Sequence, residues 1–437
     1  MTAIPHILGP IVVPPTRRAS AFLGETREEK ITFVLAVALI LVFSEVWMKP
    51  LNGSATEAAD SGLIRALYYP GYLLGIVLLA RGPWDAVRAA IRSPLLWALV
   101  LYAFVSDIWS IDNAATIRRA VALALTSAAA LSVAARLSWV GLTKVLATAF
   151  TIIGLGSFLV GLLLPSYGRM TTLFPGAWSG LFIEKNGLGA IEAQGALFCA
   201  AALFVDPTRR RVWGAATGLA VLLLLLSTSK TSLVAMTLGF AGLGFAVMVR
   251  RGPIMAVLAS FFGVLGAGLL GAAVWLMPDQ LLGLLGKDAT LTGRTLIWAA
   301  VKRQIDTRPL TGFGYGAVWS DQSGWGPVYW VAKQAGFRPA YAHDGWLDIW
   351  LGLGIGAVWL WAAYALVTWV LTIWSTYRIR DAYLALGFML VYSLTTLTES
   401  VAVAYNNIGW VLFVVVAVKL TLPDRVVAPP RAVVERR

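Results

Sequence analysis

The sequence is short of charged residues. Only 13% of its 437 residues are Asp, Glu, Lys or Arg, whereas 59% are hydrophobic. A soluble domain carries about 25% charged residues to cover its surface, so this composition excludes an ordinary soluble globule. Apolar runs close to twenty residues recur along the whole chain, and such runs are typical of membrane-crossing helices. The predicted fold class is therefore an all-α polytopic membrane protein.

Cysteine and histidine are also scarce. The chain has a single cysteine, Cys199, so it cannot form an intrachain disulfide. Cys199 lies inside an apolar run. No cluster of His and Cys has metal-ligand spacing, and no Asp-x-Asp signature is present, so we expect no metal and no other cofactor. Of the two histidines, His6 lies in a Pro-rich N-terminal stretch. His343 is thus the one histidine placed for chemistry.

Acidic residues are outnumbered by basic ones, which gives a net charge of +13. The sequence has no soluble basic module interleaved with aromatics, so nucleic acid is not an expected partner. Lys and Arg instead gather in alternate short loops, as they do on the cytoplasmic side of membrane proteins. These basic loops are 81–93, 206–211, 250–251 and 378–380. The pattern predicts a multi-pass membrane protein with both termini in the cytoplasm, which in a bacterial cell corresponds to the inner (cytoplasmic) membrane.

Twelve spans are predicted from the apolar runs. They are 31–49, 63–80, 94–108, 116–136, 139–164, 186–205, 212–227, 231–249, 253–276, 346–371, 381–398 and 407–421. This divides the chain into five parts. They are a cytoplasmic tail (1–30), spans one to nine (31–276), a periplasmic catalytic loop (277–345), spans ten to twelve (346–421) and a basic cytoplasmic tail (422–437).

The long loop between spans nine and ten is rich in aromatic residues, which disfavours disorder. "GRTLIWAAVKRQI" (293–305) predicts a helix. Its expected apolar face is Leu296, Ile297, Ala300, Val301 and Ile305. "PLTGFGYGAVW" then predicts turns because of its closely spaced glycines. We expect this loop to be partly helical and to fold against the membrane.

Two cations of the outer face stand out. Arg294 opens the predicted loop helix, where its planar guanidinium would match phosphate oxygens. The alternative is a surface arginine paired with a carboxylate. Lys230 interrupts two long apolar runs, so it either faces a cavity or extends to the lipid headgroups.

Further cations begin spans six and four. Lys185 follows Glu184, so it either forms an exposed ion pair or lines the same outer cavity. Arg118 and Arg119 open span four from the outside. Adjacent residues point in different directions on a helix, so at most one of these two arginines is expected to face a site.

"AYAHDGW" places His343 and Asp344 at the start of span ten. Histidine is the side chain that most readily accepts a proton near neutral pH, and Asp344 is placed to orient its imidazole. The alternatives are an interfacial histidine beside an N-cap aspartate.

Several motifs follow one another in a recognisable order. They are "FIEKNGLGA", "LSTSKTSLV", "LTGRTLIWAAV", "RPLTGFGYGAVW", "AHDGWLDIWLGLGIGA", "TLTES" and "NNIGWVLFV". Together they resemble the O-antigen ligase/polymerase superfamily over roughly residues 170–420, and most of all its exopolysaccharide-production polymerase branch. The sequence departs from the family pattern in having Asp344 where Asn is more usual, Glu184 where His is frequent, and Lys230 where Arg is frequent.

The resemblance implies a membrane glycosyltransferase that uses undecaprenyl-diphosphate-linked glycans on the periplasmic face. A polymerase would extend a lipid-linked repeat unit, whereas a ligase would transfer the glycan to lipid A core or another acceptor. Implied partners are membrane lipids and the flippase and chain-length or export proteins of the pathway. A transporter or flippase is a further alternative, and it would depend on an intramembrane carboxylate such as Glu192.

The resemblance also implies roles for individual residues. His343 would act as general base, and the cations Arg294, Lys230, Lys185, Arg118 and Arg119 would neutralise the diphosphate without a metal. The residues expected to bind sugar or acceptor are Glu399, Asn406, Trp346 and Trp319. For the two tryptophans the alternative is anchoring at the membrane interface.

Overall fold

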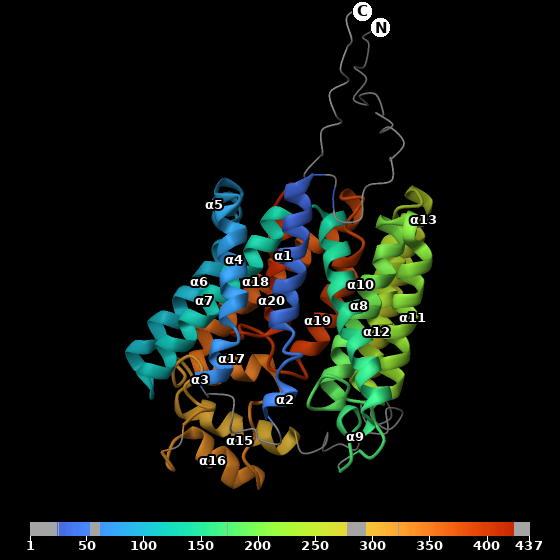
Figure 1. Cartoon of the computed structure of the whole chain (residues 1–437). Helices are drawn as coiled ribbons and strands as arrows, with labels where there is room; N and C mark the ends of the chain where they lie inside the picture. Colours follow the sequence, from blue (N-terminus) through green and yellow to red (C-terminus); the bar gives the residue numbers. More distant parts are fainter. Residues whose placement is uncertain are drawn as a thin grey trace, which may run out of the picture.

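The computed structural model describes residues 24, 26–52, 62–172, 174–277, 294–321 and 323–423. Within these ranges all regular structure is helical apart from one isolated bridge between Arg169 and Trp178, which confirms the predicted all-α class. Long helices run side by side between two ends of the molecule, and most of the short helices gather at one of these ends, whereas α5 lies at the other (Figure 1).

The long helices form the body of the bundle. They are α1 (Arg27–Phe43), α4 (Tyr69–Ala80), α6 (Pro94–Val105), α7 (Asn113–Arg136), α8 (Trp139–Leu163), α10 (Lys185–Val205), α11 (Arg210–Ser227), α12 (Lys230–Val249), α13 (Pro253–Leu276), α18 (Ile355–Arg378), α19 (Leu384–Thr396) and α20 (Ile408–Thr421). The short elements are α2 (Lys49–Asn52), α3 (Gly62–Ala66), α5 (Pro83–Ile91), η2 (Ser106–Trp109), α9 (Pro165–Gly168), η3 (Pro207–Arg209), α15 (Arg294–Thr307), α16 (Pro327–Ala335) and α17 (Gly345–Leu353).

Among the described residues, eight helices are long and apolar enough to cross a membrane. A ninth is reached if α5 and the segment 94–109, which meet at 81°, count as one broken span. The chain is therefore a multi-pass membrane protein, but the predicted count of twelve is not reached on these criteria. Spans eleven and twelve are shorter than predicted, at 13 residues for α19 and 14 for α20. Asn407 begins α20 as its N-cap, because its side chain accepts hydrogen bonds from the backbone of Gly409 and Trp410.

The prediction of one continuous span over 346–371 is wrong, because the chain breaks at Gly354 between α17 and α18. Gly354 has a φ of +81°, a backbone conformation that glycine adopts without steric cost. The break lets the turn after α15 dock here. The amide of Ile355 donates to the carbonyl of Pro309 (3.0 Å), and the amide of Phe313 donates to the carbonyl of Leu351 (3.0 Å).

We expect Gly354→Ala to lower the thermal stability of the protein. A Cβ at this position would lie 2.1 Å from the carbonyl oxygen of Leu310. The backbone of Gly354, with φ of 81° and ψ of 177°, is also one that essentially only glycine adopts, and it costs other residues roughly 1–3 kcal/mol. Size-exclusion profiles recorded after heating would measure the loss. Gly266→Ala in α13, where a Cβ meets nothing within 4 Å, is the matched control. Equal melting temperatures for both variants would contradict the docking role of Gly354.

The loop between α13 and α17 has a hydrophobic core of its own, built mainly from α15, α16 and α17. The helix predicted over 293–305 is confirmed as α15. Four of its five predicted apolar positions are buried, but Leu296 is 54% exposed. The glycine-rich stretch after α15 forms the predicted turns, with positive φ at Gly312, Gly314 and Gly316. The first part of the predicted loop, 278–293, lies outside the described residues.

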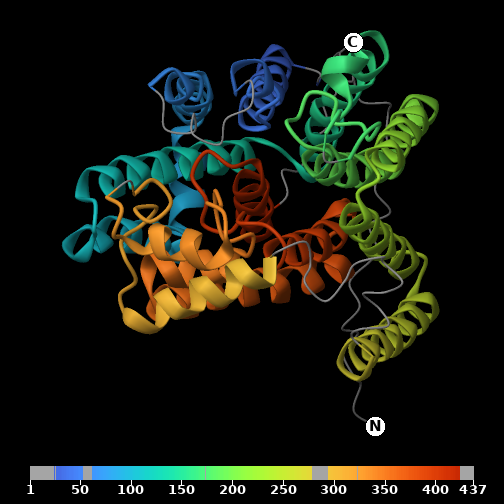
Figure 2. The ribbon, with the colours of Figure 1, turned by 90° about the horizontal axis from the view of Figure 1, so that it is seen from below.

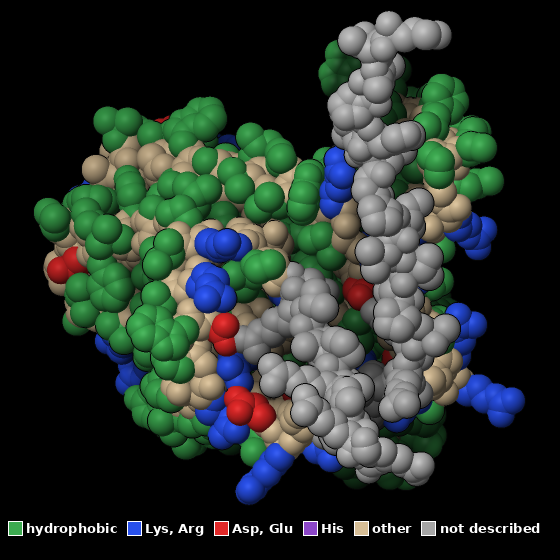
Figure 3. Space-filling view, turned by 90° about the horizontal axis from the view of Figure 1, so that it is seen from above, with side chains coloured by type: hydrophobic (Ala, Val, Ile, Leu, Met, Phe, Trp, Pro, Cys, Tyr) green, Lys and Arg blue, Asp and Glu red, His purple; other side chains and the backbone are tan. Residues whose placement is uncertain are grey.

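The predicted basic loops meet at the end of the bundle opposite α15 and α16 (Figure 1). Arg250 donates to the carbonyls of Ile379 and Arg380, and Arg92 donates to the carbonyl of Thr421 (3.0 Å). Figure 3 looks onto this end and shows Lys and Arg side chains scattered among hydrophobic ones. The alternation of loop charge along the sequence thus corresponds to two different ends of the fold.

Candidate functional site

A cavity of about 2440 Å³ lies on the side of the loop helices, among α4, α7, α10, α12 and the segments that precede α17 and α20. Figure 2, seen from this end, shows these elements surrounding the middle of the molecule. Of the eleven residues predicted for the site, nine line this cavity. These nine are Arg118, Arg119, Lys185, Lys230, Arg294, Trp319, His343, Glu399 and Asn406.

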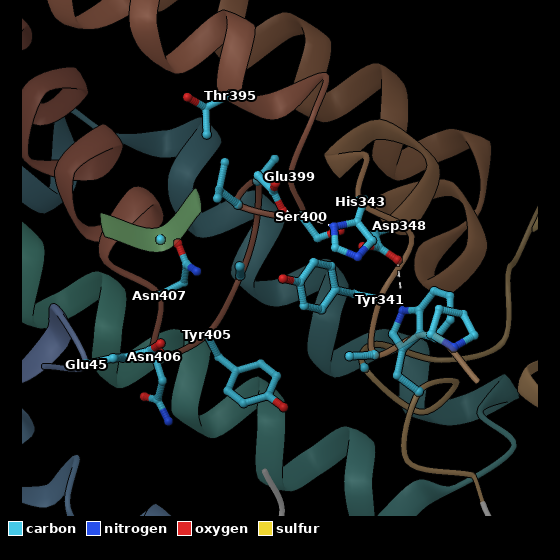
Figure 4. A pocket seen from close by; sticks show the side chains of 18 of the residues that line it. Glu45, Tyr341, His343, Asp348, Thr395, Glu399, Ser400, Tyr405, Asn406 and Asn407 are labelled. Carbon is cyan, nitrogen blue, oxygen red and sulfur yellow. Dashed lines mark hydrogen bonds and ion pairs between the residues drawn. The ribbon is translucent and has the colours of Figure 1, made fainter. Parts of the chain in front are cut away.

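His343 is held in a hydrogen-bonded chain that the sequence did not reveal. Its Nδ1 lies 3.1 Å from Oε2 of Glu399, and the other oxygen of Glu399 accepts a 2.7 Å hydrogen bond from Arg294. Arg294 also donates to the carbonyl of Thr398 (2.6 Å), which fixes the guanidinium. Figure 4 shows the imidazole and Glu399 on the wall of the pocket, with Tyr341 next to them.

This chain selects the tautomer of the neutral imidazole. Burial alone would raise the pKa of Glu399, but the hydrogen bond with His343 and the charge of Arg294 outweigh it and hold the pKa below its usual value. An ionised carboxylate only accepts hydrogen bonds, so Nδ1 of His343 carries the proton. In the neutral imidazole this tautomer leaves Nε2 with a lone pair, as a general base requires.

Asp344 is not the carboxylate that orients His343. Its Oδ1 accepts hydrogen bonds from the backbone of Trp346 (2.9 Å) and Leu347 (3.0 Å), so it is the N-cap of α17. It does not line the cavity. The side chain of an N-cap residue turns back over the first helical turn, and this geometry takes the carboxylate away from the preceding residue. Glu399, predicted as an acceptor ligand, is the group beside the imidazole.

The two tryptophans have different surroundings. Trp346 does not line the cavity; its ring packs 6.2 Å from the ring of Trp361 on α18, which contradicts a place at the sugar. Trp346 lies in the first turn of α17, on the side of that helix that packs against α18. Trp319 does line the cavity, and its Nε1 donates a 2.8 Å hydrogen bond to Asp348.

Asp348 is a site residue that sequence reasoning missed. Its carboxylate accepts from the amide of Ala342 at 3.3–3.4 Å, and the carbonyl of Ala342 accepts from Nε1 of Trp298 at 3.0 Å. The backbone is thus held on both sides one residue before His343. Burial raises the pKa of Asp348 to about 6, although the hydrogen bond from Trp319 opposes the shift. The spacing of Asp344 and Asp348, four residues apart on one helix, was the available signal.

Cations outnumber carboxylates on the described wall of the cavity. The cations are Lys49, Arg65, Arg118, Arg119, Lys185, Lys230, Arg294 and Arg338. The carboxylates are Glu45, Glu184, Asp321, Asp348 and Glu399. Lys49, Arg65 and Arg338 were not predicted, because they lie in segments far apart in the sequence that the fold brings together. The net positive wall favours an anionic ligand.

The five predicted cations are not equivalent. Lys185 and Lys230 are the first residues of α10 and α12, and Nζ of Lys185 donates to the hydroxyl of Thr228 (3.2 Å). Arg118 and Arg119 both line the cavity, so the expectation that at most one would do so is wrong. The cavity is wide enough to meet two adjacent faces of α7. Arg119 donates to the hydroxyl of Ser320 (2.8 Å) and so ties α7 to the outer loop.

Strained backbone also concentrates at the cavity. Five non-glycine residues in the described part of the chain have positive φ, and all five line it. They are Glu45, Thr228, His343, Val403 and Asn406. Left-handed conformations of such residues cost free energy and cluster at functional sites. The positive φ of these five residues could not be predicted from the sequence, because only glycine adopts such a conformation routinely.

No group of three or more His, Cys, Asp or Glu side chains within the described ranges is arranged to hold a metal ion. Glu192, on which the transporter alternative depends, is buried in α10 and does not line the cavity.

No family profile matches the chain. A comparison with curated proteins finds similarity to "Exopolysaccharide production protein ExoQ" of Rhizobium meliloti (strain 1021), with 29% identity over 295 residues. The alignment covers 64% of this chain and 66% of that relative, which is slightly less than two thirds of its length. The resemblance predicted from the motifs, to the O-antigen ligase/polymerase superfamily and its exopolysaccharide-production branch, is thereby confirmed.

Proposed function

We propose that this protein is a membrane glycosyltransferase that polymerises an exopolysaccharide. It transfers a growing glycan from undecaprenyl diphosphate to the terminal sugar of a new lipid-linked repeat unit. The observation that carries the proposal is the hydrogen-bonded chain of Arg294, Glu399 and His343 on the wall of a cation-rich cavity. A base and several cations around one cavity are what transfer from a lipid diphosphate requires.

In the proposed step, a hydroxyl of the acceptor sugar attacks the anomeric carbon of the donor glycan. The new bond joins the acceptor oxygen to that carbon, while the bond from the carbon to the diphosphate oxygen breaks and its electron pair leaves with the diphosphate. Nε2 of His343 takes the hydroxyl proton. Glu399 keeps the proton on Nδ1 and stabilises the imidazolium that forms.

The leaving diphosphate needs neutralisation of charge more than it needs a proton. Lys185 and Lys230, at the starts of α10 and α12, combine side-chain charge with the positive ends of two long helices. Arg294 contributes less to neutralising the diphosphate than the sequence predicted, because Glu399 already balances its charge. The proposed transfer is metal-independent, since fixed cations take the place of a divalent ion.

The cavity is proposed to face the periplasm, because the basic loops lie at the other end of the bundle and such loops stay in the cytoplasm. Undecaprenyl-linked repeats delivered by a flippase would then reach the cavity from the outer leaflet.

Expression in a bacterial host that lacks its own exopolysaccharide polymerase tests the function. We expect the lipid-linked glycans to change from single repeat units to long chains, and purified protein to keep its rate in EDTA. Single repeat units that leave the lipid and appear, without being lengthened, on another acceptor would instead identify a ligase. Single repeat units that persist at normal protein levels would refute both transferase activities.

Asp348→Asn should reduce turnover roughly three- to tenfold. The substitution keeps Oδ1, which accepts from Trp319 and, at 3.4 Å, from Ala342, but it replaces Oδ2 with an amide nitrogen opposite the N–H of Ala342. Loss of a hydrogen bond is worth about 0.5–1.5 kcal/mol. The His343 imidazole would then be less well fixed. Polymer formed per folded protein gives the measurement. Asp306→Asn, on the exposed face of α15, is the control for loss of one carboxylate. Equal rates in the two variants would contradict the positioning role.

A further inference from the structure

A second polar cluster lies on the opposite side of the cavity from His343, and the proposed transfer step does not use it. Tyr68 donates its hydroxyl to Oε1 of Glu45 (2.7 Å), and Tyr72 donates its hydroxyl to Oδ1 of Asn406 (2.5 Å). Figure 4 shows Glu45 and Asn406 together on one side of the pocket and His343 on the other. The two pairs lie next to each other because Tyr68 and Tyr72 are one helical turn apart.

Two residues of this cluster have a backbone conformation that costs free energy. Glu45 and Asn406 come from segments more than 350 positions apart, and both have left-handed backbone, with φ of 61° and 57°. Asn406 is only 8% exposed. The hydroxyl of Thr126 also binds it, because it donates to Oδ1 of Asn406 and accepts from the backbone amide of Asn406. Three hydrogen bonds from two side chains, Tyr72 and Thr126, therefore hold the residue in a single orientation. Such preorganisation is typical of a binding position.

Hydrogen-bonding capacity is left over on the cavity side. Oδ1 of Asn406 already accepts two hydrogen bonds, and its Nδ2 has no acceptor among the described residues. Oε1 of Glu45 accepts from Tyr68, and its Oε2 has no donor in the same part of the structure. One amide donor and one carboxylate acceptor thus line the cavity side by side. Tyr69, 58% exposed on the same wall, offers an aromatic face.

We propose that Glu45, Asn406 and Tyr69 form a subsite that binds a sugar of the acceptor repeat unit through its hydroxyl groups. This inference rests on the proposed function. Neighbouring hydroxyls of a pyranose both donate and accept hydrogen bonds, so they match a carboxylate oxygen beside an amide N–H. The apolar face of the ring packs on a tyrosine.

The subsite is connected to the base. Tyr341 lines the same cavity as Glu45 and Asn406 and lies next to His343 (Figure 4). The rings of Tyr341 and His343 are 4.3 Å apart. An oligosaccharide bound at Glu45 and Asn406 would therefore extend past Tyr341 and bring another of its hydroxyls to Nε2 of His343.

Binding of a soluble probe separates this subsite from catalysis. The probe is the oligosaccharide released by mild acid from the lipid-linked repeat unit, which lacks a diphosphate and cannot be a donor. Its dissociation constant would be measured by titration calorimetry with the full-length protein in detergent. We expect Glu45→Gln and Asn406→Asp each to weaken binding at least tenfold. Both variants keep the side-chain shape, and the carboxylate introduced at position 406 still accepts from Tyr72. As the control, Asp306→Asn is expected to bind the oligosaccharide as tightly as the wild type.

Turnover measurements complete the test. Glu45→Gln and Asn406→Asp should raise KM for the lipid-linked repeat about tenfold and leave kcat within threefold, with unchanged melting temperatures. Unchanged dissociation constant and KM in both variants, in a protein that does polymerise, would overturn the subsite and leave the proposed function intact. A protein that binds the oligosaccharide through these two residues but never extends a repeat unit would support the subsite and refute the polymerase.

Discussion

Replacing His343 with asparagine should reduce the rate of glycan transfer roughly 10²- to 10⁴-fold, the range that a positioned general base contributes. Asparagine has no basic nitrogen, so the acceptor hydroxyl would keep its proton as it approaches the anomeric carbon. Asparagine is a better replacement than alanine, because His343 has a φ of +54° and asparagine tolerates left-handed backbone. The variant therefore removes the base without adding strain next to α17.

The control for this variant is its neighbour. Asp344→Asn keeps an N-cap of equal quality and lies off the cavity, so we expect a rate within about twofold of the wild type. Transfer by purified protein, normalised to the folded fraction, measures both. A large loss in Asp344→Asn would restore the role first expected for that carboxylate. A His343→Asn protein that still makes long chains at the wild-type rate would rule out His343 as the base.

Local sequence pattern was a good guide to the helices and to the cations of the site. Apolar runs predicted where the helices lie, and polar interruptions between them identified Lys185 and Lys230. Family motifs then placed Glu399 and Asn406 at the site. Local pattern failed where a helix is broken for a tertiary reason, as at Gly354, because an apolar run of suitable length has the same appearance with or without a break.

Side-chain partners were the least predictable feature. Asp344 adjoins His343 in sequence, yet the imidazole is bound by Glu399, which is 56 positions away. Arg294 is 105 positions from the same carboxylate. Neither pairing leaves a periodic signal, since it depends on how the outer loop folds over the bundle. The left-handed backbone at Glu45 and Asn406 is likewise a tertiary effect, imposed by the groups that hold these residues.

Replacing Glu399 with glutamine should reduce kcat nearly as much as the loss of His343, roughly 10²-fold or more, without raising KM for the lipid-linked repeat. The glutamine oxygen can still accept from Arg294, which leaves the amide nitrogen facing Nδ1 of His343. An amide nitrogen only donates, so the imidazole would place its proton on Nε2, where the base must have a lone pair. Arg294 would also lose the charge that balances it, and the cavity would attract a diphosphate at least as strongly.

The double variant Arg294→Ala, Glu399→Gln provides the sharper test. If Arg294 acts mainly by holding Glu399, its removal should cost little once Glu399 is gone, and the two effects would be far from additive. If Arg294 binds the diphosphate directly, the double variant should show both losses multiplied, with a raised KM. A Glu399→Gln protein whose kcat stays within threefold of the wild type would show that the tautomer of His343 is set elsewhere. Because a change of tautomer acts on kcat and a lost phosphate contact acts on KM, the two roles of this ion pair can be measured separately.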